Sequence, residues 1–80
     1  MKRVILSAEG MTAKQRAELA GTTKDAKELR RLANDNDDWV RIEVAGNSST
    51  PPEALAELAD DESYGVRVGV EGNPNTPVTM

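Results

Sequence analysis

The sequence predicts a helical-repeat fold in one small domain, and three observations carry this prediction. Residues 35–47 (DNDDWVRIEVAGN) return 26 positions later as residues 61–73 (DESYGVRVGVEGN). The leucines and alanines just upstream, in residues 29–33, recur at the same offset in residues 55–59. A fixed period of this size is typical of repeat arrays, whose units bury their apolar faces against neighbouring units. The chain has only 80 residues, so it forms one domain with a thin core.

The N-terminal part predicts a short extended segment followed by a cap on the stack. The apolar run Val4–Leu6 is prone to extended structure, and Gly10 interrupts the chain after it. Thr12 and Gln15 have the spacing of a helix capping box, and Gly21 predicts the left-handed residue that ends the helix. Residues 15–21 echo residues 40–46 at an offset of 25. Residues 1–21 are therefore predicted to form a half-repeat.

Residues 22–46 are predicted to form the first full repeat. Thr22 or Thr23 is expected to cap a helix whose leucines and alanines share one face. The polar run at residues 34–38 ends that helix and offers the N-cap of the next one. The valine-rich segment at residues 39–45 is ambiguous, because its apolar residues alternate as in a strand but also fit helical spacing.

Residues 47–72 are predicted to form the second repeat, and residues 73–80 begin a truncated third. Thr50 and Glu53 predict a capping box, with two prolines suited to the first turn of the helix. The valine-rich segment of this repeat again alternates, and each glycine inside it costs a helix about 1 kcal/mol. The pattern alone therefore leaves two folds open: an all-α stack, or an α+β fold in which the valine-rich segments are strands.

One phrase of the sequence resembles the leucine-rich repeat variant family. The phrase is Val-Arg-x-x-Val, then Gly-Asn-x-x-Thr-Pro, then Leu-x-x-Leu-Ala, and it occupies residues 40–59. The resemblance extends over residues 22–77. It implies an all-α, right-handed solenoid of about two and a half repeats, built from α- and 3₁₀-helices in the style of HEAT and armadillo repeats. It also implies protein binding.

The composition argues against most catalytic chemistry. The chain has no cysteine, which excludes disulfides, thiol nucleophiles and the iron–sulfur cluster that one member type of the family carries on an added segment. It also has no histidine, the commonest general base and metal ligand. An EF-hand loop counted from Asp35 would place Val40 and Gly46 where glycine and glutamate are required. We therefore expect no enzyme activity, no cofactor and no metal site.

The net charge of −4 is unevenly distributed along the chain. Residues 1–41 hold nine basic and seven acidic side chains, a net charge of +2, whereas residues 42–80 hold one basic and seven acidic side chains, a net charge of −6. Such polarity can guide a partner. The N-terminal apolar run is too short for a signal peptide, and no stretch approaches a membrane span, so a cytoplasmic protein of bacterial or phage type is expected.

The candidate partner-binding residues are those that break the repeat symmetry or carry charge at its edges. Trp39 and Tyr64 do not align with each other, whereas Arg41 and Arg67 do. Trp39 fits either an anchor for a partner or the main filler of a poor core. The two arginines fit either a row aimed at an acidic partner or a structural ladder in which each binds a turn carboxylate, and the ladder is favoured. The remaining candidates are a basic stripe and two acids: Lys24, Lys27, Arg31, Glu57 and Asp61.

The function predicted from these features is a non-catalytic protein–protein interaction module. The alternative is a small acidic phage-type inhibitor that mimics nucleic-acid phosphates and blocks a nucleic-acid-binding enzyme. Direct nucleic-acid binding is disfavoured by the acidic second half. Because the third repeat is truncated, the last helical layer is expected to be uncovered, and a second copy of the chain could cover it as a homodimer.

Overall fold

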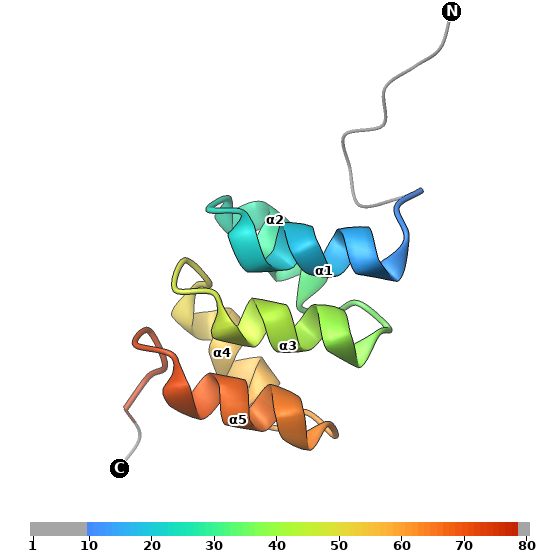
Figure 1. Ribbon diagram of the computed structural model, residues 1–80. Helices are drawn as coiled ribbons and strands as arrows, with labels where there is room; N and C mark the ends of the chain where they lie inside the picture. Colours follow the sequence, from blue (N-terminus) through green and yellow to red (C-terminus); the bar gives the residue numbers. More distant parts are fainter. Residues whose placement is uncertain (1–9, 79–80) are drawn as a thin grey trace, which may run out of the picture.

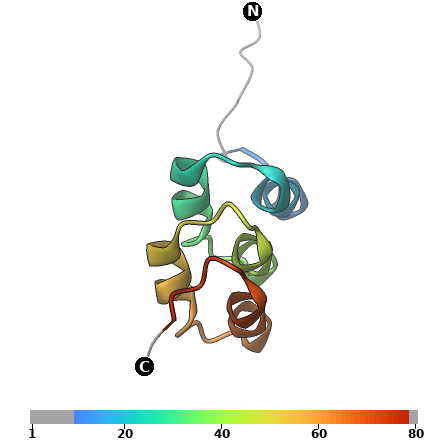
Figure 2. The same cartoon turned by 90° about the vertical axis from the view of Figure 1, so that its left-hand side faces the viewer.

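The computed structural model describes residues 10–78, and within this range the chain forms five α-helices and no strand. The helices are α1 (Ala13–Thr22), α2 (Ala26–Leu32), α3 (Asp38–Gly46), α4 (Pro52–Leu58) and α5 (Tyr64–Gly72). Figure 1 shows α1, α3 and α5 stacked in chain order, with α3 between the other two. Seen from the side in Figure 2, α2 and α4 form a second row beside them. The all-α helical-repeat prediction is confirmed.

The α+β alternative is wrong, because both valine-rich segments are helical. Val40 and Val44 in α3, like Val66 and Val70 in α5, are four residues apart and buried on one helical face. Val68, which would share their strand face, is instead 46% exposed. Stacking between layers therefore outweighs the strand preference of valine.

The helix starts follow local capping chemistry, and the sequence predicted some of them. The capping box of Thr12 and Gln15 at α1 is confirmed, with hydrogen bonds of 3.1 and 2.9 Å. Asp37, from the predicted polar run, accepts from the Trp39 amide at 2.8 Å and caps α3. Since carboxylates at this position satisfy free amides of the first turn, α2 and α3 both start at an aspartate N-cap.

Two predicted helix boundaries are wrong. Gly21 lies inside α1, which ends at Thr22 with Thr23 as its C-cap in extended conformation, because the chain turns towards α2 without a left-handed residue there. Asp25, rather than either threonine, caps α2. Each misassignment shifts a boundary by only a few residues.

The capping box predicted at Thr50 and Glu53 is also wrong. Pro51 is the N-cap of α4, and no side chain caps this helix. The Thr50 hydroxyl instead turns inward and donates to the Val44 carbonyl at 2.7 Å, with no exposed surface. A buried carbonyl needs a partner more than a solvent-facing amide does, which explains where the hydroxyl points.

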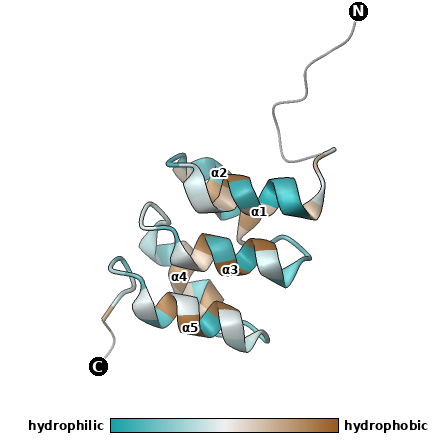
Figure 3. Ribbon diagram, viewed as in Figure 1, coloured by the Kyte–Doolittle hydropathy of each residue, from teal (hydrophilic) through white to brown (hydrophobic). Residues whose placement is uncertain are grey.

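The core is a thin seam of small aliphatic side chains between the two rows of helices. Figure 3 shows brown, hydrophobic segments interrupted by teal ones along every helix. No aromatic residue belongs to the core, so the interpretation of Trp39 as the main core filler is wrong. The core residues are Ala17, Ala20, Leu29, Leu32, Ala33, Val40, Val44, Ala45, Ala54, Leu55, Leu58, Val66 and Val70.

Of the remaining sequence predictions about the fold, the described residues test the one on helix type and leave the others untested. The extended segment Val4–Leu6 lies outside the described residues. No 3₁₀-helix occurs among residues 10–78, so the helices of this stack are all of the α type. The right-handed sense and the domain boundaries at residues 21, 46 and 72 stay predictions.

Candidate interaction surface

A row of arginines runs along the stack and links successive layers; we call Arg16, Arg41 and Arg67 the arginine ladder. Arg16 lies in α1 and donates from Nε and Nη2 to the carboxylate of Asp35, at 2.8 and 3.3 Å. Arg41 in α3 donates in the same way to Asp61, at 2.8 and 3.2 Å. The predicted ladder is therefore confirmed for Arg41, which is not free to bind a partner through this edge.

The third nitrogen of each guanidinium fixes its orientation. Nη1 of Arg16 donates to the Met11 carbonyl at 2.7 Å, and Nη1 of Arg41 donates to the Asp35 carbonyl at 2.8 Å. Nη1 of Arg67 donates to the Asp61 carbonyl at 2.6 Å. All three arginines are thus held by the turn that precedes their own layer, with the Nε–Nη2 edge left for the layer that follows.

Arg67 differs from the other two in what its Nε–Nη2 edge contacts. Among residues 10–78, no hydrogen-bond acceptor or carboxylate reaches this edge. The guanidinium carbon lies 5.7 Å from the centre of the Tyr64 ring, close enough for a cation–π contact. Arg67 is half-buried, so its free edge is one of the few cationic groups positioned by the fold rather than by solvent.

The pairing of Arg41 and Asp61 perturbs the pKa of both groups. Burial raises the pKa of Asp61, but the hydrogen bonds from Arg41 and from the Ser63 amide, with the charges of Arg41 and Arg67, lower it below its ordinary 3.8 overall. The hydrogen bond to Asp61 raises the pKa of Arg41 above its ordinary value, although the burial of the guanidinium acts in the opposite direction. Both groups are therefore charged near neutral pH, and their side chains are each only 11% exposed.

Two buried asparagines make a second set of contacts between layers. Nδ2 of Asn47 donates to the carbonyls of Ala20 and Thr23, both at 2.8 Å, and Nδ2 of Asn73 donates to Ala45 and Asn47 at 2.7 and 2.9 Å. Each Nδ2 thus binds the end of the helix in the preceding layer, where carbonyls lack intrahelical partners, while each Oδ1 accepts the amide two residues further along the chain. Both asparagines are structural.

The two aromatic residues are on the surface. Trp39 in the first turn of α3 is 45% exposed, and Tyr64 at the start of α5 is 74% exposed. Aromatic side chains exposed to this extent on a protein with so small a core are candidates for partner contact. Tyr64 also lies beside Arg67, whose guanidinium carbon is 5.7 Å from the centre of the ring.

The other predicted site residues are dispersed. Lys24 precedes α2, whereas Lys27 and Arg31 belong to it; all three are exposed. Glu57 is exposed on α4, and the carboxylate of Asp61 is paired with Arg41. The structure therefore brings Arg67 and Tyr64 together but separates them from the basic stripe.

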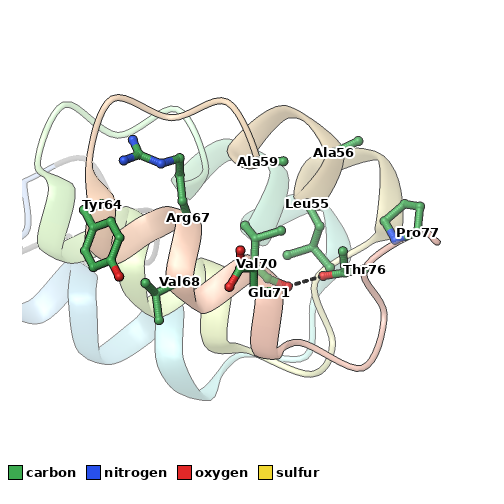
Figure 4. A pocket seen from close by; sticks show the side chains of 10 residues that line it. All are labelled: Leu55, Ala56, Ala59, Tyr64, Arg67, Val68, Val70, Glu71, Thr76 and Pro77. Carbon is green, nitrogen blue, oxygen red and sulfur yellow. Dashed lines mark hydrogen bonds between the residues drawn. The ribbon is translucent and has the colours of Figure 1, made fainter. Parts of the chain in front are cut away.

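A groove of about 390 Å³ lies where α4 and α5 present the outer face of the last layer. Figure 4 shows Tyr64, Arg67 and Val68 at one end and Pro77 at the other, with Leu55 and Val70 between them. The Thr76 hydroxyl donates to the Val70 carbonyl, which holds the C-terminal turn against this face. Sequence reasoning had named only two residues of the groove. Val68 was detectable, since it is the valine that the helical period leaves outside the core.

A second, shallower hollow is lined mainly by polar residues at the helix starts. It contains Asp37, Asp38, Glu62 and Ser63, next to Arg41. Within residues 10–78, no three acidic side chains come close enough together to hold a metal ion. In the same part of the chain, no helix is long and apolar enough to cross a membrane.

Comparison with known proteins supports the repeat assignment. Residues 38–63, which contain α3 and α4, match the family described as leucine rich repeat variant. No curated protein and no solved structure matches the chain. The resemblance inferred from the phrase at residues 40–59 is therefore confirmed.

Proposed function

Because the chain carries a leucine-rich repeat variant unit at residues 38–63, we propose that it is a non-catalytic protein–protein interaction module. Repeat scaffolds of this kind spend most of their polar side chains on stacking, as the asparagines and two of the three arginines do here. The residues that remain available for a partner are the exposed ones outside the repeat pattern. A cytoplasmic location stays a prediction.

The observation that carries this proposal is the groove on α4 and α5. Tyr64 and Val68 are exposed there at 74% and 46%, while Leu55 beneath them is fully buried. Aromatic and aliphatic side chains around a positioned cation are the composition of an interface centre. We infer that a protein partner contacts this face, which we call the α5 face (Leu55, Tyr64, Arg67, Val68 and Pro77).

Affinity capture from a lysate of the source organism tests the proposal. The tagged chain is compared with a variant carrying Tyr64→Ala and Val68→Asp. It is also compared with a Lys27→Ala variant, which changes an exposed residue of α2 outside the groove. A partner retained by the chain and by Lys27→Ala, but lost from the double variant, supports the α5 face. Retention by all three proteins would contradict it. Retention at high salt would indicate an apolar contact rather than a charge-driven one.

The phosphate-mimicking inhibitor receives less support. Phosphate mimicry needs free carboxylates in a row, but Asp35 and Asp61 are paired with arginines, and Asp25 and Asp37 cap helices. In the acidic hollow, Asp38 and Glu62 are the carboxylates that neither pair with an arginine nor cap a helix. Charge reversal of Glu57 together with Glu62 tests this alternative, since an inhibitor of this type would lose all binding to its target enzyme.

A further inference from the structure

We propose that Arg67 and the adjoining groove bind a helix of another protein that follows an aspartate-containing turn, and that this helix docks as if it were the next layer of the stack. This inference rests on the proposed interaction function and adds the chemistry of the partner. It requires that Arg67 is already positioned, that its free edge selects a carboxylate, and that the groove accepts a helix.

Arg67 is positioned before any partner binds. Its Nη1 holds the Asp61 carbonyl at 2.6 Å, the same backbone contact that orients Arg16 and Arg41. Tyr64 packs over the guanidinium at 5.7 Å. A side chain with this much fixed geometry loses little conformational entropy on binding.

The free edge of Arg67 matches a carboxylate in one orientation. In the two earlier layers the same Nε–Nη2 edge takes both oxygens of an aspartate from the following layer, at 2.8 Å from Nε and 3.2–3.3 Å from Nη2. That aspartate also accepts an amide two residues on: Asp35 from Asp37 at 3.0 Å, and Asp61 from Ser63 at 2.9 Å. The expected ligand is therefore an aspartate in the turn before a helix.

The groove accepts the helix that follows such a turn. In the preceding layers, α3 packs on α1 and α5 packs on α3. At the α3–α5 contact, Gly65 and Gly69 of α5 lie so close to Ile42 and Ala45 of α3 that a Cβ at either glycine would come within 2.8 Å of them. Val68 and Pro77 present the corresponding surface of the last layer, at 46% exposure for Val68, and Leu55 forms its base. The partner helix should thus carry small residues at positions i and i+4 after its turn aspartate, as Gly65 and Gly69 follow Asp61 in this chain.

Another protein fits this face better than a second copy of the chain. In a second copy, both aspartates with the required geometry are already bound, Asp35 to Arg16 and Asp61 to Arg41. Residues 42–80 carry a net charge of −6, so two copies of this half repel each other at low salt. The homodimer expected from the sequence is therefore not the occupant that we propose.

The test uses a peptide with the sequence of residues 59–73, acetylated and amidated, which carries an aspartate turn and the following helix. Its binding to the full chain is measured by NMR titration, which detects weak complexes. The matched probe is the same peptide with Asp61→Asn. We expect the first peptide to shift the resonances of Arg67 and Val68. The Asp61→Asn peptide should bind at least about tenfold more weakly, because a charge-assisted bidentate pair is lost.

Chain variants locate the binding. Arg67→Gln should weaken the aspartate peptide about tenfold, and Arg67→Lys, which keeps the charge but loses the fork, should weaken it by a similar factor. Arg31→Gln, an equal charge change at an exposed arginine of α2, should leave binding unchanged. Circular dichroism of each variant confirms that it is folded.

Three results would overturn the inference. They are no binding of either peptide at millimolar concentration, equal binding of the aspartate and asparagine peptides, and a dimer of the chain alone that Arg67→Gln dissociates in light scattering. Any of these results can occur while the double variant Tyr64→Ala with Val68→Asp still fails to capture the partner. In that case the interaction function stands, and only the proposed helix with its aspartate turn is rejected.

Discussion

Replacing Arg41 by glutamine should destabilise the fold far more than the same change at Arg30. Both arginines pair with a carboxylate of the next repeat, Arg41 with Asp61 at 2.8 Å and Arg30 with Glu53 at 3.0 Å. They differ in burial: the first pair is 11% exposed on both sides, whereas the side chains of the second are 53% and 63% exposed. The comparison therefore isolates the effect of burial on an ion pair between layers.

The expected magnitudes follow from that difference. Breaking a buried, doubly hydrogen-bonded pair leaves an uncompensated carboxylate and costs about 3–5 kcal/mol. An exposed pair contributes only about 0.2–1 kcal/mol. Since a domain of 80 residues has a total unfolding free energy of about 4–12 kcal/mol, Arg41→Gln should remove a large part of it and Arg30→Gln very little.

Urea unfolding monitored by far-ultraviolet circular dichroism measures both losses. The double variant Arg41→Gln with Asp61→Asn should recover part of the loss, because it removes the buried unpaired charge. If the two single variants lost equal free energy of unfolding, the Arg41–Asp61 pair would contribute no more than an exposed ion pair and would not be an important link between layers. A double variant as unstable as the sum of its parts would contradict the direct pairing.

Three further outcomes are expected. Because the pKa of Asp61 lies below 3.8 in the fold, its carboxylate adds stability above about pH 4 that is lost as the pH falls further, and Asp61→Asn should flatten this loss in acid unfolding. Gly69→Ala should lower the thermal midpoint although alanine has the better helix propensity, because the new Cβ would lie 2.8 Å from the side chain of Ala45 in α3. Gly46→Ala is the control: its new Cβ would have nothing within 4 Å, so it should raise the free energy of unfolding by about 0.5–1 kcal/mol. Thr50→Val should cost about 1–3 kcal/mol in urea unfolding by leaving the Val44 carbonyl unsatisfied, and Thr50→Ser should cost less.

The sequence predicted the features that depend on residues repeating at a fixed distance. The 26-residue period fixed the layers, and the equivalence of Arg41 and Arg67 led to the ladder. Arg16 was visible in the 25-residue echo but was not assigned to the ladder, because its partner Asp35 lies 19 residues away, in the turn between α2 and α3. Contacts of this range depend on how the layers stack, which local patterns do not specify.

The incorrect predictions concern residues with two competing uses. Thr50 has the spacing of a cap, yet its hydroxyl satisfies a buried carbonyl. Trp39 has the size of a core residue, yet the layers are too close together for it and small aliphatic residues fill the core. The free edge of Arg67 could not be predicted from sequence, because it is defined by the absence of an acceptor among residues 10–78.

Hydrogen exchange of the three arginine Nε–H groups tests most directly whether the ladder ends in an open carboxylate site. In the free chain at neutral pH, the Nε–H groups of Arg16 and Arg41 should exchange slowly, because each donates to a carboxylate at 2.8 Å, and that of Arg67 should exchange fast. Adding the aspartate peptide of residues 59–73 should slow Arg67 and leave the other two unchanged. An Arg67 Nε–H that is already protected in the free chain, or that stays fast with the peptide at saturation, would contradict the account.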